Sequence, residues 1–111
     1  MEINWNDFEK IEIHTGTIIE VADFPKAKKP AYQLRIDFGE KIGILKTSAQ
    51  ITDLYQKQAL INTQVLAVTN FPPKQIANFI SECLVLGVYS KDDKVVLLRP
   101  DTVVENGCRM G

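Results

Sequence analysis

The chain has 111 residues, of which 45% are hydrophobic and 24% are charged, and its formal net charge is −1. A chain of this length fits one domain, residues 1–111, whose single core removes roughly two-thirds of the unfolded surface from water. The near-neutral charge provides no general attraction to nucleic acid or to anionic membranes, and no apolar run reaches the roughly 18 residues of a membrane span. The start of the chain lacks the basic and apolar regions of a secretory signal, so we expect a cytoplasmic protein.

A short helix and a long strand are predicted at the N-terminus. Asn4 can cap the helix, and Asp7 stands at its third position, where a carboxylate favours the free amides. The strand covers residues 11–24 and is apolar at alternate positions. Gly16 lies in its middle and permits a sharp bend of the kind that a barrel corner requires.

The middle of the chain changes from strand to helix and back. Residues 31–38 alternate between apolar and polar side chains and lead through a turn into residues 42–47, which predicts a hairpin. Residues 48–57 space their apolar side chains three and four apart, with Ser48 as the cap, which predicts a short helix. A strand pattern returns at residues 64–71.

The last third of the chain completes a small all-β pattern. Residues 83–90 and 95–98 predict a second hairpin, and residues 100–111 are expected to form a strap across the surface. Three strands, a helix and further strands are the order of an OB-fold. We therefore predict an all-β, five-stranded OB-fold barrel with two short helices, one N-terminal and one between the third and fourth strands.

The connection between the fourth and fifth predicted strands, residues 72–82, interrupts apolar sequence with paired prolines. Pro72 and Pro73 cannot donate ladder hydrogen bonds, so they end the strand and stiffen the loop. Such a loop holds polar side chains at the mouth of the barrel, where binding residues concentrate. Alternatively, the loop's apolar residues fold back to plug the barrel end, and the two interpretations are compatible.

Basic residues gather in one part of the chain. Residues 1–22 hold five acidic side chains against one lysine, whereas residues 23–50 hold six basic side chains against three acidic ones. If a polyanion such as tRNA binds, this stretch is the surface that we expect to contact it. The nucleic-acid-binding residues of this alternative are Lys26, Lys28, Lys29, Arg35, Lys46 and Lys74. The other interpretation is a solvated surface of mixed charge.

The sequence indicates no catalytic machinery. His14 is the only histidine, and no nucleophile or orienting group pairs with it in the pattern. Cys83 and Cys108 lie far apart, without a CxxC pair or a histidine cluster, which supports neither a metal site nor a disulfide framework. The glycines form neither a dinucleotide-binding motif nor a P-loop. We therefore expect a binding protein with no catalytic residues, no metal and no cofactor.

Several stretches resemble one known family. FEKIEIHTGTI, residues 8–18, is similar to the opening of the tRNA-binding OB domains that are appended to some aminoacyl-tRNA synthetases and also occur as free-standing dimers. Within that group, an export-chaperone branch is similar to this chain at FPKAKKPAYQLRIDFG (24–39), GILKTSAQIT (43–52) and NFPPKQIANFISECLVLG (70–87). With the C-terminal VVLLRPDTVVENGCRMG, the resemblance covers nearly the whole chain.

The resemblance implies a cytoplasmic homodimer that binds unfolded or presecretory polypeptides and assists protein export alongside the translocase ATPase, with tRNA binding as the alternative. We expect the N-terminal helix and the C-terminal strap to take part in dimerisation. Carboxamides add groups that can hydrogen-bond an extended backbone whatever the sequence of the bound chain. The expected peptide-binding residues are Ser48, Gln50, Asn70, Phe71, Pro73, Lys74, Gln75, Asn78, Phe79, Ser81 and Glu82.

The chain departs from the wider family's motifs at three places. His14-Thr15 stands where the family has Arg-Val, which removes a fixed positive charge. Ser48-Ala49-Gln50 replaces SGI, and residues 81–84, SECL, replace SEGM. These departures weaken an inference to tRNA binding more than one to peptide binding.

Overall fold

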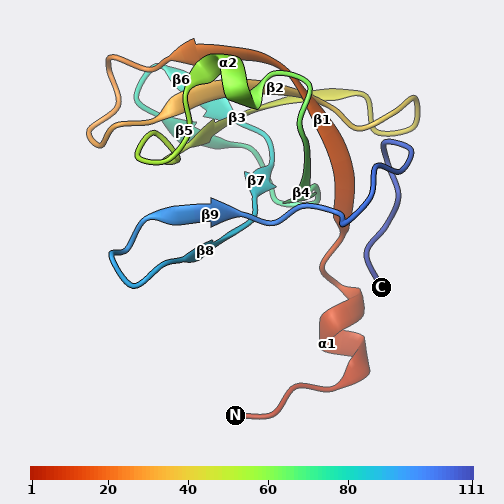
Figure 1. Ribbon diagram of the computed structural model, residues 1–111. Coiled ribbons are helices and arrows are strands. Elements are labelled where there is room, and N and C mark those ends of the chain that lie inside the picture. The colour runs from red at the N-terminus through yellow and green to blue at the C-terminus, as the bar shows by residue number, and fades with distance from the viewer.

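A computed structural model describes all residues, 1–111, and the chain is mostly β-structure. Figure 1 shows a curved barrel with one helix hanging below it and one hairpin extending from its side. The elements in chain order are α1 (Trp5–Glu9), β1 (Ile13–Asp23), β2 (Tyr32–Asp37), β3 (Ile44–Ala49), α2 (Lys57–Leu60), β4 (Gln64–Val68), β5 (Lys74–Ile76), β6 (Phe79–Ser81), β7 (Leu84–Val85), β8 (Gly87–Tyr89) and β9 (Val95–Leu97).

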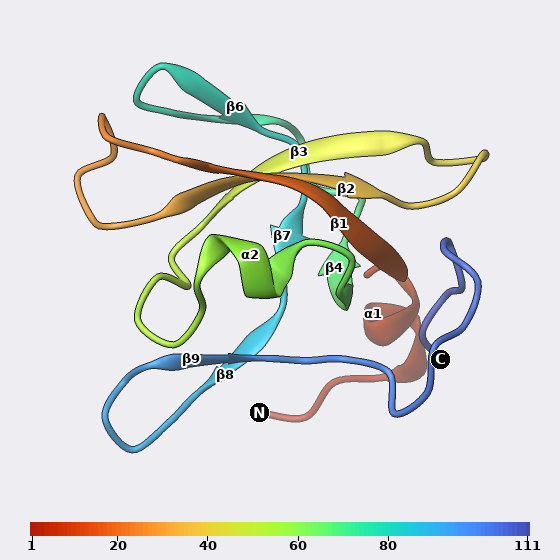
Figure 2. The ribbon, with the colours of Figure 1, turned by 45° about the horizontal axis from the view of Figure 1, so that its top comes forward.

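Five antiparallel strands form the main sheet in the order β3-β2-β1-β4-β7. The sheet curls until its two ends meet, because the Glu82 N–H, between β6 and β7, donates to the Lys46 C=O of β3 at 2.8 Å. The result is a nearly closed barrel (Figure 2). It confirms the predicted five-stranded OB-type fold with two short helices.

The long strand β1 runs along both halves of the barrel. Its first residues pair with β4 and its last residues with β2. Gly16 lies where a Cβ atom would come within 2.6 Å of the Ile36 side chain and 2.7 Å of the Phe38 ring. The glycine therefore lets β1 pass directly over the core.

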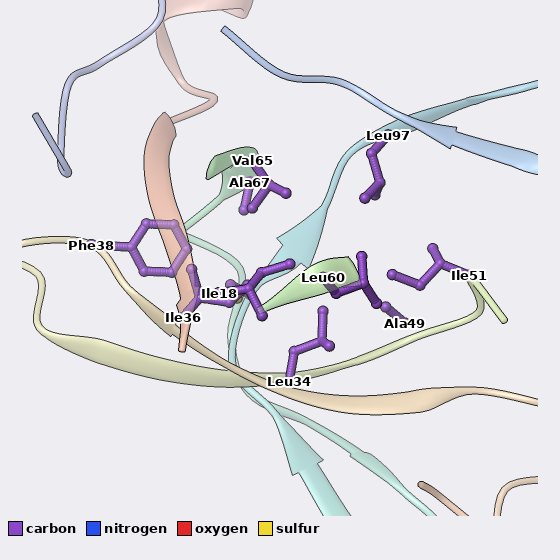
Figure 3. Close-up of a cluster of buried hydrophobic side chains, with 11 residues drawn as sticks. Ile18, Leu34, Ile36, Phe38, Ala49, Ile51, Leu60, Val65, Ala67 and Leu97 are labelled. Atoms are coloured by element: carbon purple, nitrogen blue, oxygen red, sulfur yellow. The ribbon is translucent and has the colours of Figure 1, made fainter. Parts of the chain in front are cut away.

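The core fills the inside of the barrel. Its largest fully buried side chains include Phe38, Ile18 and Leu34, and Leu60 of α2 closes one end. Figure 3 shows these side chains converging from β1, β2, α2 and β4. The alternation predicted for residues 31–38 is confirmed, since its apolar positions are the buried ones.

The helix predicted over residues 48–57 is wrong. Ser48 continues β3 and pairs with Gln33 of β2 instead of capping a helix. The helix of this connection is a single turn further on, α2, and its N-cap residue Gln56 makes no side-chain capping bond. Pairing with β2 extends β3 because tertiary pairing overrides a weak local helix preference.

The strand predicted to reach residue 71 ends at Val68, and the loop predicted over residues 72–82 contains the two-stranded hairpin β5–β6. Its turn begins at Ala77, whose φ is +53°, a conformation that glycine usually adopts. The second predicted hairpin is confirmed as β8–β9, but its first residues, Leu84 and Val85, form the separate strand β7.

Both chain ends are ordered by hydrogen bonds. The predicted N-cap of α1 at Asn4 is confirmed, and the structure adds a capping box: the Asp7 N–H donates to the Asn4 side chain at 2.9 Å, and the Asn4 N–H donates to the Asp7 carboxylate at 3.1 Å. The C-terminal segment lies along β1 as a strap, where the Thr15 N–H donates to the Cys108 C=O at 3.0 Å and the Met110 N–H donates to the Ile13 C=O at 2.8 Å. No helix combines the length and apolarity that a membrane crossing demands.

Candidate functional site

Two hollows lie on one side of the barrel, between the β1–β2 connection, the β5–β6 hairpin and the β8–β9 hairpin. All three segments point to the same side in Figures 1 and 2. Loops gathered at one side of a rigid barrel are where OB-folds bind ligands.

The first hollow, which we call the proline hollow, has a volume of about 710 Å³. Its walls come from the segment that enters β5 and from the ends of β3, β6 and β7. It brings together six of the eleven expected peptide-binding residues: Ser48, Phe71, Pro73, Lys74, Gln75 and Ser81. Phe71 is 54% exposed, so most of an aromatic face is free to contact a ligand.

The second hollow, which we call the lysine hollow, has a volume of about 750 Å³. Gln50 lies in its wall directly after β3, and it is the seventh expected residue that these two hollows contain. The opposite walls are Tyr89 of β8 and the turn residue Ala77. Tyr89 was not among the predicted site residues. It lines the same hollow as Gln50, about forty positions earlier in the chain, only because β8 folds back toward the end of β3.

A buried chain of hydroxyl groups forms the floor of the proline hollow. The Ser48 N–H donates to Ser81 Oγ at 3.1 Å, the Ser81 and Thr47 hydroxyl oxygens lie 2.8 Å apart, and Thr47 Oγ1 donates to the Cys83 C=O at 2.7 Å. Thr47 and Ser81 are buried. Ser81 therefore positions the β6–β7 connection against β3 as well as lining the hollow.

The Cys83 thiol lies beside this floor and is shielded from water. Burial raises its pKa to about 12, against the weaker lowering effect of its hydrogen bond with Thr47, and the nearby Glu82 carboxylate raises it further. A thiol with such a pKa stays protonated and is a poor nucleophile.

Glu82 and Asn70 lie outside both hollows and hold the backbone. The Glu82 carboxylate accepts the Lys46 N–H at 2.9 Å, which strengthens the barrel closure. The Asn70 amide donates to the Lys10 C=O at 2.7 Å and accepts the Glu12 N–H at 3.0 Å, so it joins the end of β4 to the link between α1 and β1. Their backbone contacts could not be read from the sequence, because each partner is more than thirty residues away.

Phe79 and Asn78 also lie outside both hollows. The Phe79 ring packs on Phe24, with 5.5 Å between centroids, and the Lys46 ammonium lies 5.3 Å from the ring centre. Phe79 thereby lines a third hollow of about 470 Å³ on the outer face of β1, β2 and β3. Asn78 is exposed at the hairpin tip.

The six basic residues of the nucleic-acid alternative are divided among three hollows. Lys26, Lys28 and Lys29 line the lysine hollow, and Lys74 lines the proline hollow. Arg35 and Lys46 face the third hollow as cross-strand partners, and Arg35 pairs with Glu20 at 3.4 Å. These bases therefore do not form one uninterrupted stripe.

The contacts of His14 hold neighbouring segments of the chain together. Its Nδ1 lies 2.8 Å from Thr69 Oγ1, and its backbone bridges to Arg109 of the strap. No His, Cys, Asp and Glu side chains cluster in a way that could hold a metal ion. What the two hollows offer chemically is apolar contact, hydrogen bonding and the positive charge of four lysines.

A nearly closed five-stranded barrel that carries its hollows between loops defines an OB-type binding domain. The family model described as "Putative tRNA binding domain" matches residues 13–109. The chain is 32% identical over 110 residues to a methionine–tRNA ligase of Pyrococcus abyssi, which covers 99% of this chain but only 15% of the ligase.

Two solved structures match the chain over its length. The CsaA chaperone protein from Picrophilus torridus is 55% identical with a TM-score of 0.94, covering 99% of this chain and 100% of that one. Chaperone CsaA from Bacillus anthracis is 41% identical with a TM-score of 0.94 and full coverage of both chains. The chain belongs to the putative tRNA-binding domain family and, within it, to the CsaA group.

Proposed function

We propose that this chain is an ATP-independent molecular chaperone that binds unfolded polypeptides or preproteins and assists protein export. The observation that carries the proposal is the proline hollow, where exposed apolar groups, Phe71 and Leu84, lie next to the hydrogen-bonding side chains of Gln75 and Ser48. Apolar contact combined with polar groups that can bind a peptide backbone suits many clients, because neither depends on one client sequence. The likeness to CsaA chaperones supports the same function.

The proposed activity is binding without catalysis. Burial raises the pKa of the Cys83 thiol, which keeps the thiol protonated and makes it a poor nucleophile. The hollows combine apolar walls with amides and lysines, which are groups for recognition.

We further propose that residues 1–111 act as one OB domain within a homodimer, in contact with the export translocase ATPase. Exposed apolar side chains on α1 and on the strap support the dimer: Trp5 is 69% exposed and Val103 is 87% exposed. Two sites in a dimer strengthen binding to one long client by about 10² to 10⁴ over a single weak site.

The dimer is tested by light scattering on Trp5→Glu and Val103→Asp. Point substitutions are preferable to truncation, since residues 107–110 hydrogen-bond to β1 and hold the fold. Loss of the dimer with retained folding is the expected result. A dimer that persists in both variants contradicts this interface.

The peptide site is tested by fluorescence titration with an unfolded presecretory peptide. Phe71→Ala and Gln75→Ala are compared with Leu54→Ala and Gln58→Ala, which truncate similarly exposed residues outside the hollows. We expect Phe71→Ala to weaken binding about tenfold, the size of an interface hot spot, and the controls to bind as the unaltered chain does. Equal affinity in all four variants removes the site assignment.

The second candidate function is structure-specific tRNA binding. It is favoured by the family model and by the exposed bases Lys26, Lys28 and Lys29. It predicts a tRNA affinity that falls steeply with salt, because each neutralised phosphate releases counterions. A flat salt response, or no retention of tRNA, rejects it.

A further inference from the structure

The two hollows are parts of one groove. Ser48, Ile76 and Leu84 line both of them, so the proline hollow opens into the lysine hollow across these three side chains. The combined groove passes from the paired prolines at one end to the β1–β2 connection at the other. A single extended chain that crosses these three side chains therefore contacts both hollows.

The charged side chains of the groove are all positive, and most of them lie at one end. Its lining contains four lysines and no carboxylate. Three of them, Lys26, Lys28 and Lys29, stand together at one end, are exposed and take part in none of the ion pairs of the structure. Lys74 stands alone at the other end.

Apolar side chains line the same hollow as the lysine cluster. Ile51 and Ala31 are buried there, and Leu86 and Val95 are half-buried. Lysines beside an apolar surface match a ligand that combines apolar side chains with nearby negative charge. A purely apolar ligand would leave the lysines without partners, and a purely anionic one would leave the apolar surface uncovered.

We propose that the groove selects extended polypeptide segments in which apolar residues adjoin acidic residues, with the acidic end held by Lys26, Lys28 and Lys29. This inference rests on the proposed chaperone function and specifies its substrate class. The acidic end fixes the orientation of the segment in the groove. Basic segments are disfavoured, since their charges would face four uncompensated lysines.

A peptide fits these observations better than RNA. Base stacking requires a row of aromatic faces, and the lining offers only two exposed rings, Phe71 at one end and Tyr89 near the other. The remaining bases, Arg35 and Lys46, belong to the third hollow on another face. RNA binding is therefore an outcome of the test below and not the inference.

The experiment uses three fluorescent nine-residue peptides with one apolar core sequence. The core is followed by three glutamates, three glutamines or three lysines. At low salt we expect the acidic peptide to bind about tenfold more tightly than the neutral one, roughly the effect of two exposed ion pairs, and the basic peptide to bind more weakly than both. At about 0.5 M salt the ratio of the acidic peptide's affinity to the neutral peptide's affinity falls toward one, because exposed charges are screened.

A charge-matched pair of triple variants locates the effect. Substituting Lys26, Lys28 and Lys29 with glutamine removes the acidic preference, so that the acidic and neutral peptides then bind with equal affinity. The control substitutes Lys10, Lys41 and Lys91 with glutamine, which changes the net charge equally outside the groove, and it keeps the preference. Carbodiimide coupling of the bound acidic peptide, which joins carboxylates to amines, is expected to modify the first set of lysines and not the second.

The outcomes separate this inference from the function on which it rests. If all three peptides bind equally, or if both triple variants behave alike, the acidic selection is wrong while peptide binding stands. If no peptide binds, the chaperone function itself is contradicted. If tRNA binds with a steep salt dependence that requires Lys26, Lys28 and Lys29 while the acidic peptide does not bind, the cluster serves RNA and the inference is overturned.

Discussion

We predict that the chain of hydroxyl groups that joins β3 to the β6–β7 connection stabilises the fold, and that Thr47→Val will lower the free energy of unfolding. Thr47→Val replaces a hydroxyl by a methyl group of nearly the same shape, so packing in the barrel changes little. The variant removes the donor to the Cys83 C=O at 2.7 Å and the partner of the Ser81 hydroxyl at 2.8 Å. Thr47 is 1% exposed, so water cannot replace the lost partner without opening the floor.

The expected cost follows from the carbonyl that is left without a close donor. An unsatisfied buried polar group costs about 1–3 kcal/mol. The Ser81 hydroxyl can turn to the Cys83 C=O only at 3.5 Å, which recovers little. We predict a loss of about 2 kcal/mol in the free energy of unfolding, or about 8 °C in Tm at roughly 4 °C per kcal/mol for a domain of this size.

Urea unfolding and calorimetry measure this loss, and Thr102→Val, at an exposed position, is the matched control. Ser81→Ala breaks the same chain of hydrogen bonds, so the double variant should lose less than the sum of the single ones by about 1 kcal/mol. A change below about 0.5 kcal/mol in Thr47→Val, equal to the control, would refute the view that these hydroxyl groups hold the floor.

Three further predictions concern other parts of the molecule. Gly16→Ala should cost about 2–3 kcal/mol in urea unfolding, because the added Cβ meets the Phe38 ring at 2.7 Å. Asn70→Ala should lower the free energy of unfolding by about 1 kcal/mol and leave peptide affinity unchanged, since the N–H and the C=O of the side-chain amide both already bond to backbone. The pKa of the Cys83 thiol is about 12 in the folded chain, against 9.0 for an ordinary cysteine, so folding favours the protonated thiol. The free energy of unfolding is therefore unaffected below pH 9 and falls as the pH rises from about 9 toward 12. At pH 10 the expected loss is about 1.4 kcal/mol. In urea titrations Cys83→Ala should show a shallower fall, and at pH 8 a disulfide reagent should modify Cys108 long before Cys83 in the folded chain; equal rates would contradict the burial argument.

The barrel could be predicted because its signals are local. Alternation over residues 31–38 reflects one buried face, and a one-residue slip would expose it, so the pattern fixes which face of β2 points to the core. The N-cap at Asn4 was likewise predictable, because its hydrogen-bond partner Asp7 is only three positions away. A strap across the surface was predicted from the turn-forming residues Asn106 and Gly107, whereas its place along β1 is known only from the structure.

The helix predicted at 48–57 failed because a local pattern competed with a distant partner. Ile51 is buried and Leu54 is exposed, so the helical spacing did not correspond to one buried face. Ser48 and Ala49 instead pair with β2, and the end of β3 then supplies Ser48, one of the three side chains common to both hollows. The period alone could not reveal that pairing.

The candidate site was predictable as a segment but not as a surface. The proline-rich stretch supplies walls of the proline hollow, and Pro72 and Pro73, which cannot donate ladder hydrogen bonds, lie between β4 and β5. Which side chains face the hollow depends on hydrogen bonds to remote backbone. Asn70 bonds to Lys10 and Glu12, and Glu82 bonds to Lys46, so both face away from the groove.

The same contacts that close the barrel also shape the groove, which connects stability to recognition. Glu82 and Ser81 join β3 to the β6–β7 connection, and this joint sets the distance between the β5–β6 hairpin and β7. A groove with a rigid floor loses less conformational entropy on binding than a mobile one. Weak apolar contacts and a few exposed lysines can then capture an unfolded chain, because the groove needs little reorganisation when that chain arrives.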